Sequence, residues 1–269
     1  MFEDTTDTTD ESQTTSRRNV LAGLGAGAVG LATVPAVTRA FNHGTAYEFT
    51  VTVENVSRGT TLQTTVDGES SEQGVPLSPG AYAVHSPDRP IFTTGRRERD
   101  NGLEEVAEDG SPGRLAESLA GRDSVFDAGA FDTPVGADGP GPLPPGRSYE
   151  FTAEALSGSP EMSLSLVTMF IPSNDAFYAL GGQDGLSLFD GDTPRTGNVT
   201  NAVGLWDAGT EVNQEPGVGD HQAQRQRAPG VGDVEREAVA PMVRVNGYDY
   251  PDVSDVVEVS TSAETVSDQ

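Results

Sequence analysis

The sequence contains no cysteine. This absence excludes disulfide bonds, thiolate metal sites, a cysteine nucleophile and a lipid-modified cysteine anchor. A fold that works outside the cell would therefore have to be stable without covalent cross-links. Histidine is scarce as well, with 3 scattered residues (His43, His85 and His221) and no H-E-x-x-H motif, which argues against a zinc site or a histidine catalyst.

Lysine is also absent, so all 16 basic residues are arginine, and they stand against 42 acidic residues. The net charge of −26 would repel any polyanion, which excludes nucleic acid as an expected partner. Without lysine, a phosphate-binding loop of the G-x-x-x-x-G-K-[ST] type cannot exist. An acidic surface free of lysine is typical of proteins that work in molar salt, where the Debye length is about 3 Å and like charges hardly repel. We therefore expect a halophilic protein.

The segment 16–40, "SRRNVLAGLGAGAVGLATVPAVTRA", has the pattern of an export signal. Arg17 and Arg18 precede a mildly apolar run, and small residues lie around Ala40, which together are typical of the twin-arginine route. A transmembrane helix is the alternative, but the many glycines in the run would destabilise such a helix. We expect residues 1–40 to be a disordered N-terminus plus this signal, and the mature chain to be extracellular or at the cell surface, without a transmembrane domain.

The rest of the chain predicts one large domain over residues 41–259, followed by a frayed tail at 260–269. Alternating apolar residues predict half-buried strands in "YEFTVTVENVS" (47–57) and "SYEFTAEAL" (148–156). "MSLSLVTMFI" (162–171) is apolar on both faces toward its end, as in a central strand. Shorter strands are expected at residues 62–66, 81–85, 186–189, 203–206, 242–245 and 253–259.

Two short helices interrupt these strands. In "NGLEEVAEDGSPGRLAESLAG" (101–121), apolar residues recur at helical spacing in two segments, and each segment stops at a glycine. Many short strands with Gly/Pro-rich loops predict an all-β fold, an antiparallel β-sandwich, with one or two short helices capping it.

Four blocks of the sequence resemble the spondin domain, the module of F-spondin and mindin that also occurs in bacterial and archaeal secreted proteins. The blocks are "NGLEEVAEDG" (101–110), "IPSNDAFYAL" (171–180), "DGLSLFDGD" (184–192) and "LWDAGTEVNQEPG" (205–217). Their order and spacing agree with that family. The resemblance implies a β-sandwich similar to a C2 domain, with Ca²⁺ bound by acidic residues in its loops.

Carried over by motif, the resemblance implies three metal ligands: Asp175 of "PSND" and Asp207 and Glu211 of "DAGTE". Glu211 stands where the family has aspartate, which lengthens the reach of that carboxylate. Calcium takes six to eight hard oxygens, and carboxylates in neighbouring loops can supply them together with backbone carbonyls. Gly209 would let the backbone turn, and the Gly209 or Thr210 carbonyl would complete the ligand set.

The spacing of these acids alone is not informative, because acidic pairs at this separation are common by chance in so acidic a chain. Plain surface acids, or turn-forming caps at Asn174 and Asp175, are the alternative. We expect an exported, non-catalytic binding or adhesion module with a structural calcium site and an unknown extracellular protein or glycan as partner. The alternative is a secreted carboxylate-based hydrolase that acts on polysaccharide.

Two further features can carry extracellular chemistry. Asn55 and Asn198 lie in N-x-[ST] sequons, which are potential glycosylation sites in an exported chain. Arg225 and Arg227 stand in a loop, "NQEPGVGDHQAQRQRAPGVGD" (213–233), of an otherwise acidic chain. This loop is either a recognition loop for acidic glycans or acidic neighbours, or its arginines simply pair with nearby acids.

Overall fold

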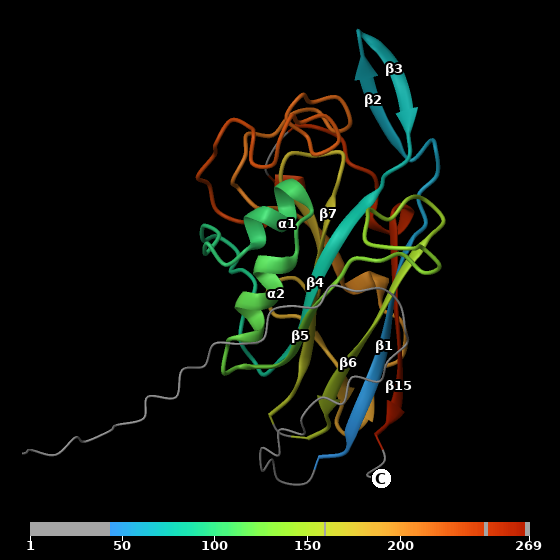
Figure 1. Ribbon diagram of the computed structural model, residues 1–269, viewed down its shortest axis with the longest axis vertical. Helices are drawn as coiled ribbons and strands as arrows, with labels where there is room; N and C mark the ends of the chain where they lie inside the picture. Colours follow the sequence, from blue (N-terminus) through green and yellow to red (C-terminus); the bar gives the residue numbers. More distant parts are fainter. Residues whose placement is uncertain (1–43, 159, 245–246, 267–269) are drawn as a thin grey trace, which may run out of the picture. The chain divides into compact units, whose positions relative to one another are not determined.

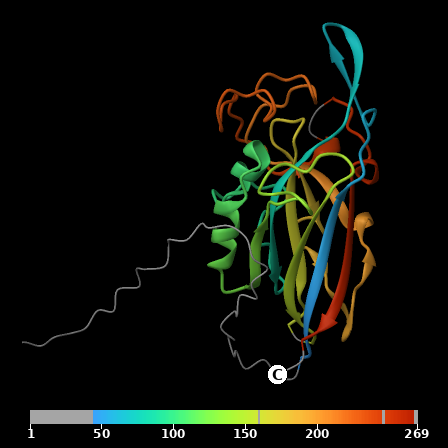
Figure 2. The ribbon, with the colours of Figure 1, turned by 45° about the vertical axis from the view of Figure 1, so that its right-hand side comes forward.

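The structure is a computed structural model that describes residues 44–158, 160–244 and 247–266. The predicted export signal at residues 1–40 lies outside the described residues. The described part is built from two antiparallel sheets that pack face to face (Figures 1 and 2). The prediction of an all-β, sandwich-like fold is confirmed. Among the residues that the structure describes, no helix is both long enough and apolar enough to cross a membrane.

The smaller sheet has the strand order β12-β15-β1-β6, and every pair in it is antiparallel. Its long strands were predicted at 47–57 and 148–156, where apolar side chains alternate with polar ones. Phe49, Val51 and Val53 of β1 are fully buried, while Glu48 and Glu54 on the other face are exposed. The strands are β1 (Ala46–Asn55), β6 (Ser148–Leu156), β12 (Gly197–Asn198) and β15 (Val257–Thr265).

The larger sheet has the order β14-β13-β8-β7-β4-β5, with β9 paired to β7 outside this path. Strand β7 lies near its middle and is buried on both faces, as its continuous apolar sequence predicted. The strands are β4 (Leu77–His85), β5 (Val125–Phe131), β7 (Ser163–Phe170), β8 (Ala176–Leu180), β9 (Leu186–Ser187), β13 (Val203–Asp207) and β14 (Ala240–Pro241).

Two separate hairpins complete the strands. One joins β2 (Leu62–Val66) to β3 (Glu69–Gln73), and the other joins β10 (Phe189–Asp190) to β11 (Thr193–Pro194). The β2–β3 turn places Asp67 and Gly68 at positive φ, as a two-residue hairpin turn requires. In Figure 1 this hairpin projects away from the two packed sheets.

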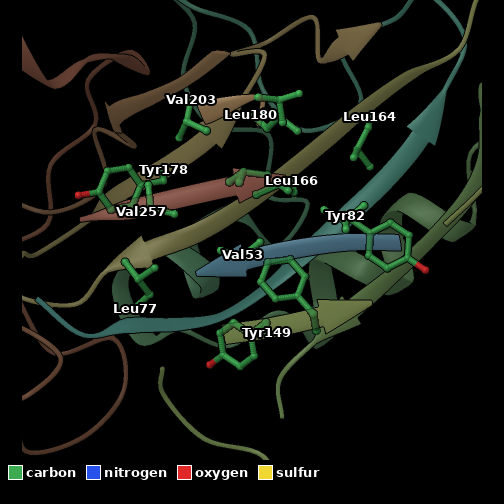
Figure 3. Packing of buried hydrophobic residues seen from close by; sticks show 14 of the residues in the cluster. Val53, Leu77, Tyr82, Tyr149, Leu164, Leu166, Tyr178, Leu180, Val203 and Val257 are labelled. Atoms are coloured by element: carbon green, nitrogen blue, oxygen red, sulfur yellow. The ribbon is translucent and has the colours of Figure 1, made fainter. Parts of the chain in front are cut away.

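The main hydrophobic core lies between the two sheets (Figure 3). Val53 and Tyr149 reach it from the smaller sheet, and Leu166 and Tyr178 reach it from the larger one. A second apolar cluster lies on the opposite face of the larger sheet, beneath the two helices. The larger sheet is therefore covered on both sides, which explains why its central strands lack a polar face.

The helices are α1 (Leu103–Asp109) and α2 (Gly113–Ala120), as predicted. They lie along the outer face of the larger sheet, mainly over β4, β5 and β7, rather than at an end of the sandwich. Leu103 and Val106 of α1 and Leu115 and Leu119 of α2 are fully buried there. Helix α1 stops at Gly110, whose left-handed conformation (φ 65°) is the usual glycine end of a helix.

Three local predictions were wrong. Residues 242–244 form a 3-10 turn, η2, and the short strand β14 precedes it. Residues 253–255 form another 3-10 turn, η3, and strand β15 starts only at Val257. The tail predicted to fray from residue 260 is part of β15 up to Thr265, since β1 and β12 pair with it from both sides and Thr261 is buried.

Candidate functional site

Two of the predicted site residues, Asp175 and Asp207, meet at one end of the larger sheet, where β8 begins and β13 ends. Strands β8 and β13 are antiparallel neighbours, and the register pairs Asp207 with Ala176. Asp175 directly precedes β8, so the loop that enters β8 and the loop that leaves β13 start side by side. The strands that precede the two loops, β7 and β13, are not neighbours, because β8 lies between them.

Asp175 is fully buried, and its two carboxylate oxygens differ sharply. Oδ2 accepts hydrogen bonds from the backbone N–H of Thr210 (2.8 Å), the Thr210 hydroxyl (3.2 Å) and the backbone N–H of Glu211 (3.1 Å). Oδ1 is buried and has no donor among the described residues. Burial, and next the charge of Asp207, raise the pKa of Asp175 well above its usual range. One oxygen thus holds the loop, and the other is left for a ligand.

Asp207 is 1% exposed and accepts bonds through both oxygens. Oδ1 accepts from the backbone N–H of Gly209 at 2.6 Å, and Oδ2 accepts from Nδ2 of Asn213 at 2.5 Å. Burial raises the pKa of Asp207, and the bonds from Asn213 and Gly209 oppose that shift. The remaining amide oxygen of Asn213, Oδ1, is buried and finds no donor in the described part of the chain. A neutral oxygen without a partner in the described residues therefore belongs to an amide that contacts Asp207.

Glu211, the third predicted ligand, is held differently. Its Oε2 accepts a bond from Nδ2 of Asn174 at 3.2 Å, and its carboxylate lies against Gly232, where an added Cβ would come within 2.1 Å of Oε1. Burial raises its pKa, while the Asn174 bond and the charge of His221 oppose this. Within residues 44–158, 160–244 and 247–266, no three His, Cys, Asp or Glu side chains converge as a metal-binding group. The structure thus brings Asp175 and Asp207 together, whereas the Glu211 carboxylate is hydrogen-bonded to the Asn174 side chain.

The turn after Asp207 depends on glycine, as the sequence suggested. Gly209 has φ 69°, and an added Cβ would come within 2.8 Å of the Glu237 carbonyl carbon. The Gly209 and Thr210 carbonyls, one of which we expected to bind the metal, accept bonds from the backbone N–H groups of Glu237 (2.9 Å) and Glu235 (2.7 Å). The segment 235–237 therefore ties the loop from its outer side.

Sequence reasoning missed Glu108, which lies on α1 and is only 5% exposed. Burial raises its pKa to about 8, with the charges of Glu211, Glu104 and Asp109 adding smaller effects, while a hydrogen bond with the Thr210 side chain opposes the shift. Glu108 therefore lies close to Thr210, whose hydroxyl donates to Asp175. Glu108 is one of four acids in the first spondin-like block, and no spacing singled it out.

The donor set suits a hard divalent cation. The oxygens of Asp175 and Asp207 are buried together, and no ion pair among the described residues reaches either carboxylate. Calcium prefers carboxylate and amide oxygens, and a bound cation would compensate charges that burial otherwise penalises. Asp175, Asp207 and Asn213 are the residues that fit such an ion, with waters and backbone carbonyls as further ligands.

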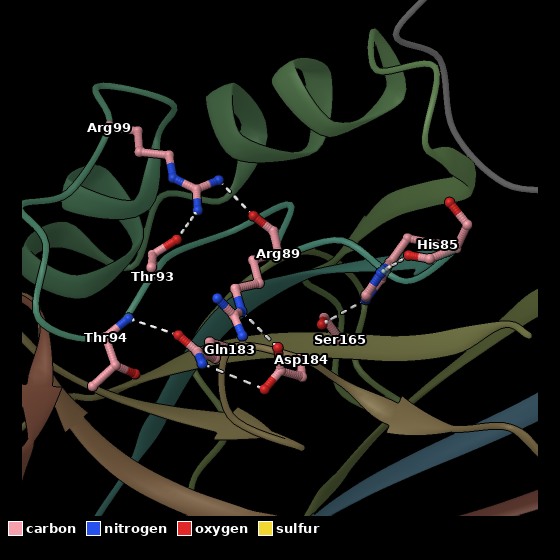
Figure 4. A network of polar contacts seen from close by, with 9 residues as sticks. His85, Arg89, Thr93, Thr94, Arg99, Ser165, Gln183 and Asp184 are labelled. Atoms are coloured by element: carbon pink, nitrogen blue, oxygen red, sulfur yellow. Dashed lines mark hydrogen bonds and ion pairs between the residues drawn. The ribbon is translucent and has the colours of Figure 1, made fainter.

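Neither of the two histidines that the structure describes, His85 and His221, belongs to a metal-binding group. His85 is fully buried and bonds through both ring nitrogens, Nδ1 to the Ser86 carbonyl (2.8 Å) and Nε2 to Ser165 Oγ (2.9 Å) (Figure 4). Both of its ring nitrogens therefore have partners within the fold. Nearby, Arg89 pairs with Asp184 at 2.6 Å, which ties the loop after β4 to the turn before β9. This network serves to hold loops together.

The two sequons differ in access. Asn55 is fully buried, and its Nδ2 donates to the Val75 carbonyl (2.8 Å) and the Leu143 carbonyl (2.9 Å). A glycan on that nitrogen is incompatible with this fold. Asn198 is exposed at the edge of the smaller sheet, where its Oδ1 accepts a bond from Thr200 N–H at 3.0 Å. Only Asn198 of the two is open to modification.

Comparisons of the chain with protein-family models and with curated protein sequences returned no match. The site itself consists of two buried aspartates and a buried amide oxygen at the ends of neighbouring strands.

Proposed function

We propose that the protein is an exported, non-catalytic binding or adhesion module of the spondin type, whose loop end is organised by Ca²⁺. The observation that carries the proposal is the buried, donor-free Oδ1 of Asp175 beside Asp207. In this proposal Ca²⁺ binds Asp175, Asp207 and Asn213. Glu211 is not a ligand; it accepts a hydrogen bond from Asn174 and thereby orients that side chain. The ion neutralises charges that would otherwise drive the two loops apart.

The arrangement of the spondin-like blocks supports this proposal. Glu108, Asp175 and the Asp207–Glu211 segment come from three of the four blocks, which are far apart in the sequence. Thr210 connects them, because it donates two hydrogen bonds to Asp175 and its side chain lies close to Glu108. Three sequence blocks singled out for their resemblance to one family thus contribute to one small polar cluster.

Burial favours a structural role over the alternative of a secreted polysaccharide hydrolase. A glycosidase needs two carboxyl groups that reach a sugar from opposite sides of the scissile bond. Asp175 and Asp207 are 0% and 1% exposed, and Oδ2 of Asp175 is occupied by the loop it holds. We therefore assign these carboxylates to stabilisation of the loops, and propose that the loops and not the acids contact the partner. We also propose that the protein is exported by the twin-arginine route and acts outside the cell or at its surface.

The test is the melting temperature with and without Ca²⁺, measured in concentrated NaCl because we expect the fold to need salt. Calcium at about 100 times its dissociation constant adds about 2.7 kcal/mol, which for a domain of this size raises the melting temperature by roughly 5–10 °C. Asp175→Asn and Asp207→Asn should abolish the rise. Asp138→Asn, at an exposed acid in the loop between β5 and β6, is the matched control and should keep it. An unchanged response in both site variants would refute the calcium site.

A further inference from the structure

The loop that follows Glu211 encloses a pocket that the calcium proposal does not use. It has a volume of about 490 Å³ and is lined by Asp220, His221, Arg225, Gln226, Arg227 and Val231. Figures 1 and 2 show this loop, in orange, beside α1. Its volume falls within the range of pockets that bind small ligands.

The loop is held by the rest of the fold and so can present a defined surface. Asp109 Oδ1, at the end of α1, accepts bonds from Gln226 Nε2 (2.7 Å) and from the backbone N–H of Gly230 (3.1 Å). Gln222 is fully buried, and its side chain bonds the backbone at Gly217 (2.9 Å) and Glu215 (2.8 Å). Arg225 and Arg227 thus project from a turn that is anchored on both sides.

The charge of this pocket is opposite to that of the protein. Two guanidinium groups line it against one carboxylate, that of Asp220, in a chain of net charge −26. Among the described residues, the ion pairs involve Arg89 and Arg114, and the guanidinium groups of Arg225 and Arg227 pair with no carboxylate. The simpler interpretation of the sequence, that these arginines pair with nearby acids, is therefore wrong. Their donors are available to an anion.

We propose that this pocket binds an acidic sugar, a hexuronate unit of a polysaccharide, with its carboxylate between Arg225 and Arg227. Guanidinium groups bind carboxylates through paired, charge-assisted hydrogen bonds whose fork geometry matches the two carboxylate oxygens. Asp220 and Gln226 can bond the sugar hydroxyls, and Val231 with the arginine stems offers an apolar surface to the ring. A single concavity lined by side chains suits one sugar ring better than an extended acidic peptide.

This inference rests on the proposed function, since it names the ligand class of the extracellular binding module. The pocket nevertheless does not include Asp175 or Asp207. Each idea can therefore fail without the other.

The experiment is isothermal titration of the full chain in concentrated NaCl, with methyl glucuronide as probe and methyl glucoside as its neutral control. We expect saturable binding of the glucuronide, no binding of the glucoside, and a loss of affinity of at least about tenfold in Arg225→Gln/Arg227→Gln. Arg97→Gln, at an exposed arginine in the loop between β4 and α1, should bind as the wild type does. Circular dichroism confirms that the double variant is folded.

Three results would overturn the proposal: no saturable binding of the glucuronide, equal affinity in the folded double variant, or tighter binding of an acidic peptide or of acetate than of the glucuronide. Repeating the titration with Asp175→Asn separates the two proposals. Glucuronide binding that survives in that variant supports the sugar pocket whatever the calcium result. If the wild type shows the calcium response but does not bind the glucuronide, the sugar pocket is refuted and the calcium site is not.

Discussion

Asp175 receives both hydrogen-bond donors of Thr210, the backbone N–H at 2.8 Å and the hydroxyl at 3.2 Å, through the same carboxylate oxygen. The second oxygen has no donor within the part of the chain that the structure describes. A buried carboxylate with only one hydrogen-bonded oxygen destabilises the fold unless a cation or a proton binds the other oxygen. This asymmetry makes the residue a sensitive probe of the site.

Asp175→Asn should stabilise the calcium-free protein. The amide oxygen can take the place of Oδ2 and keep its three hydrogen bonds, while the NH₂ group replaces the donor-free oxygen. The folded-state pKa of Asp175 is raised, so the aspartate costs stability at every pH above the range where it titrates in the unfolded chain. We expect a gain of about 1–3 kcal/mol near pH 7, measured by urea unfolding with a chelator.

The control for this prediction is Asp175→Ala, which removes the acceptor of all three bonds and should destabilise the protein. Equal destabilisation by the asparagine and alanine variants would mean that Asp175 is stabilising as a free carboxylate, contrary to this account.

Glu108→Gln should remove a pH dependence. Folding raises the pKa of Glu108 to about 8, so between pH 4.5 and about 8 the folded chain keeps a proton that the unfolded chain releases. Stability of the calcium-free protein therefore falls as pH rises through this window, by at most about 1.4 kcal/mol per pH unit from this group. The glutamine variant cannot titrate, so its advantage over the wild type should grow from pH 5 to pH 8 in urea unfolding. A constant difference would contradict the assignment.

His85→Gln should reveal the opposite dependence. Burial lowers the pKa of His85, although the Ser86 carbonyl and the charges of Asp88 and Asp184 oppose this. Below pH 6.5 the unfolded chain takes up a proton that the folded imidazole resists, so this histidine makes the protein less stable as pH falls. The stability difference between wild type and variant should therefore shrink below pH 6.5 and stay constant above it. The ¹⁵N shifts of the imidazole, followed by NMR, report its protonation directly.

Asn55→Ala should be strongly destabilising. It removes the donors to the buried carbonyls of Val75 and Leu143 and the acceptor for Ser57, at a cost of about 2–4 kcal/mol. Asn198→Ala, at the exposed sequon, should change stability by less than about 1 kcal/mol. Chemical unfolding measures both, and the intact mass of protein made in a glycosylating host should show a glycan at Asn198 or at neither site. A glycan on Asn55 would be incompatible with the structure.

The sequence was informative where the hydrophobic pattern was strong. Strands β1, β6 and β7 and both helices were predicted because burial on one or two faces leaves a clear periodicity in the side chains. The polar end of β15 was missed because its Ser and Thr residues are held by backbone bonds to neighbouring strands, which leave no pattern in the sequence. Local propensity could not distinguish the 3-10 turns η2 and η3 from strands.

The site was predictable only in part. Asp175 and Asp207 were named through their motifs, and the register between β8 and β13 accounts for their meeting. Glu108 was not, because its burial depends on where α1 lies against the larger sheet, a tertiary relationship with no local signal. Likewise, the contact of Glu211 with Asn174 depends on side-chain conformations that the four-residue spacing from Asp207 does not determine.

The pairing of β1 with β15 constrains how the chain can fold. These strands align over their whole lengths, from Tyr47 with Thr265 to Asn55 with Val257, although about 200 residues separate them in the sequence. Contacts of such high sequence separation are formed slowly, because a long loop must be closed before any gain is realised. Until β15 docks, β1 has only β6 beside it and exposes an open edge that can pair with another chain. Assembly of the smaller sheet is therefore the stage at which aggregation competes most directly with folding, and a variant that loses the last strand should aggregate.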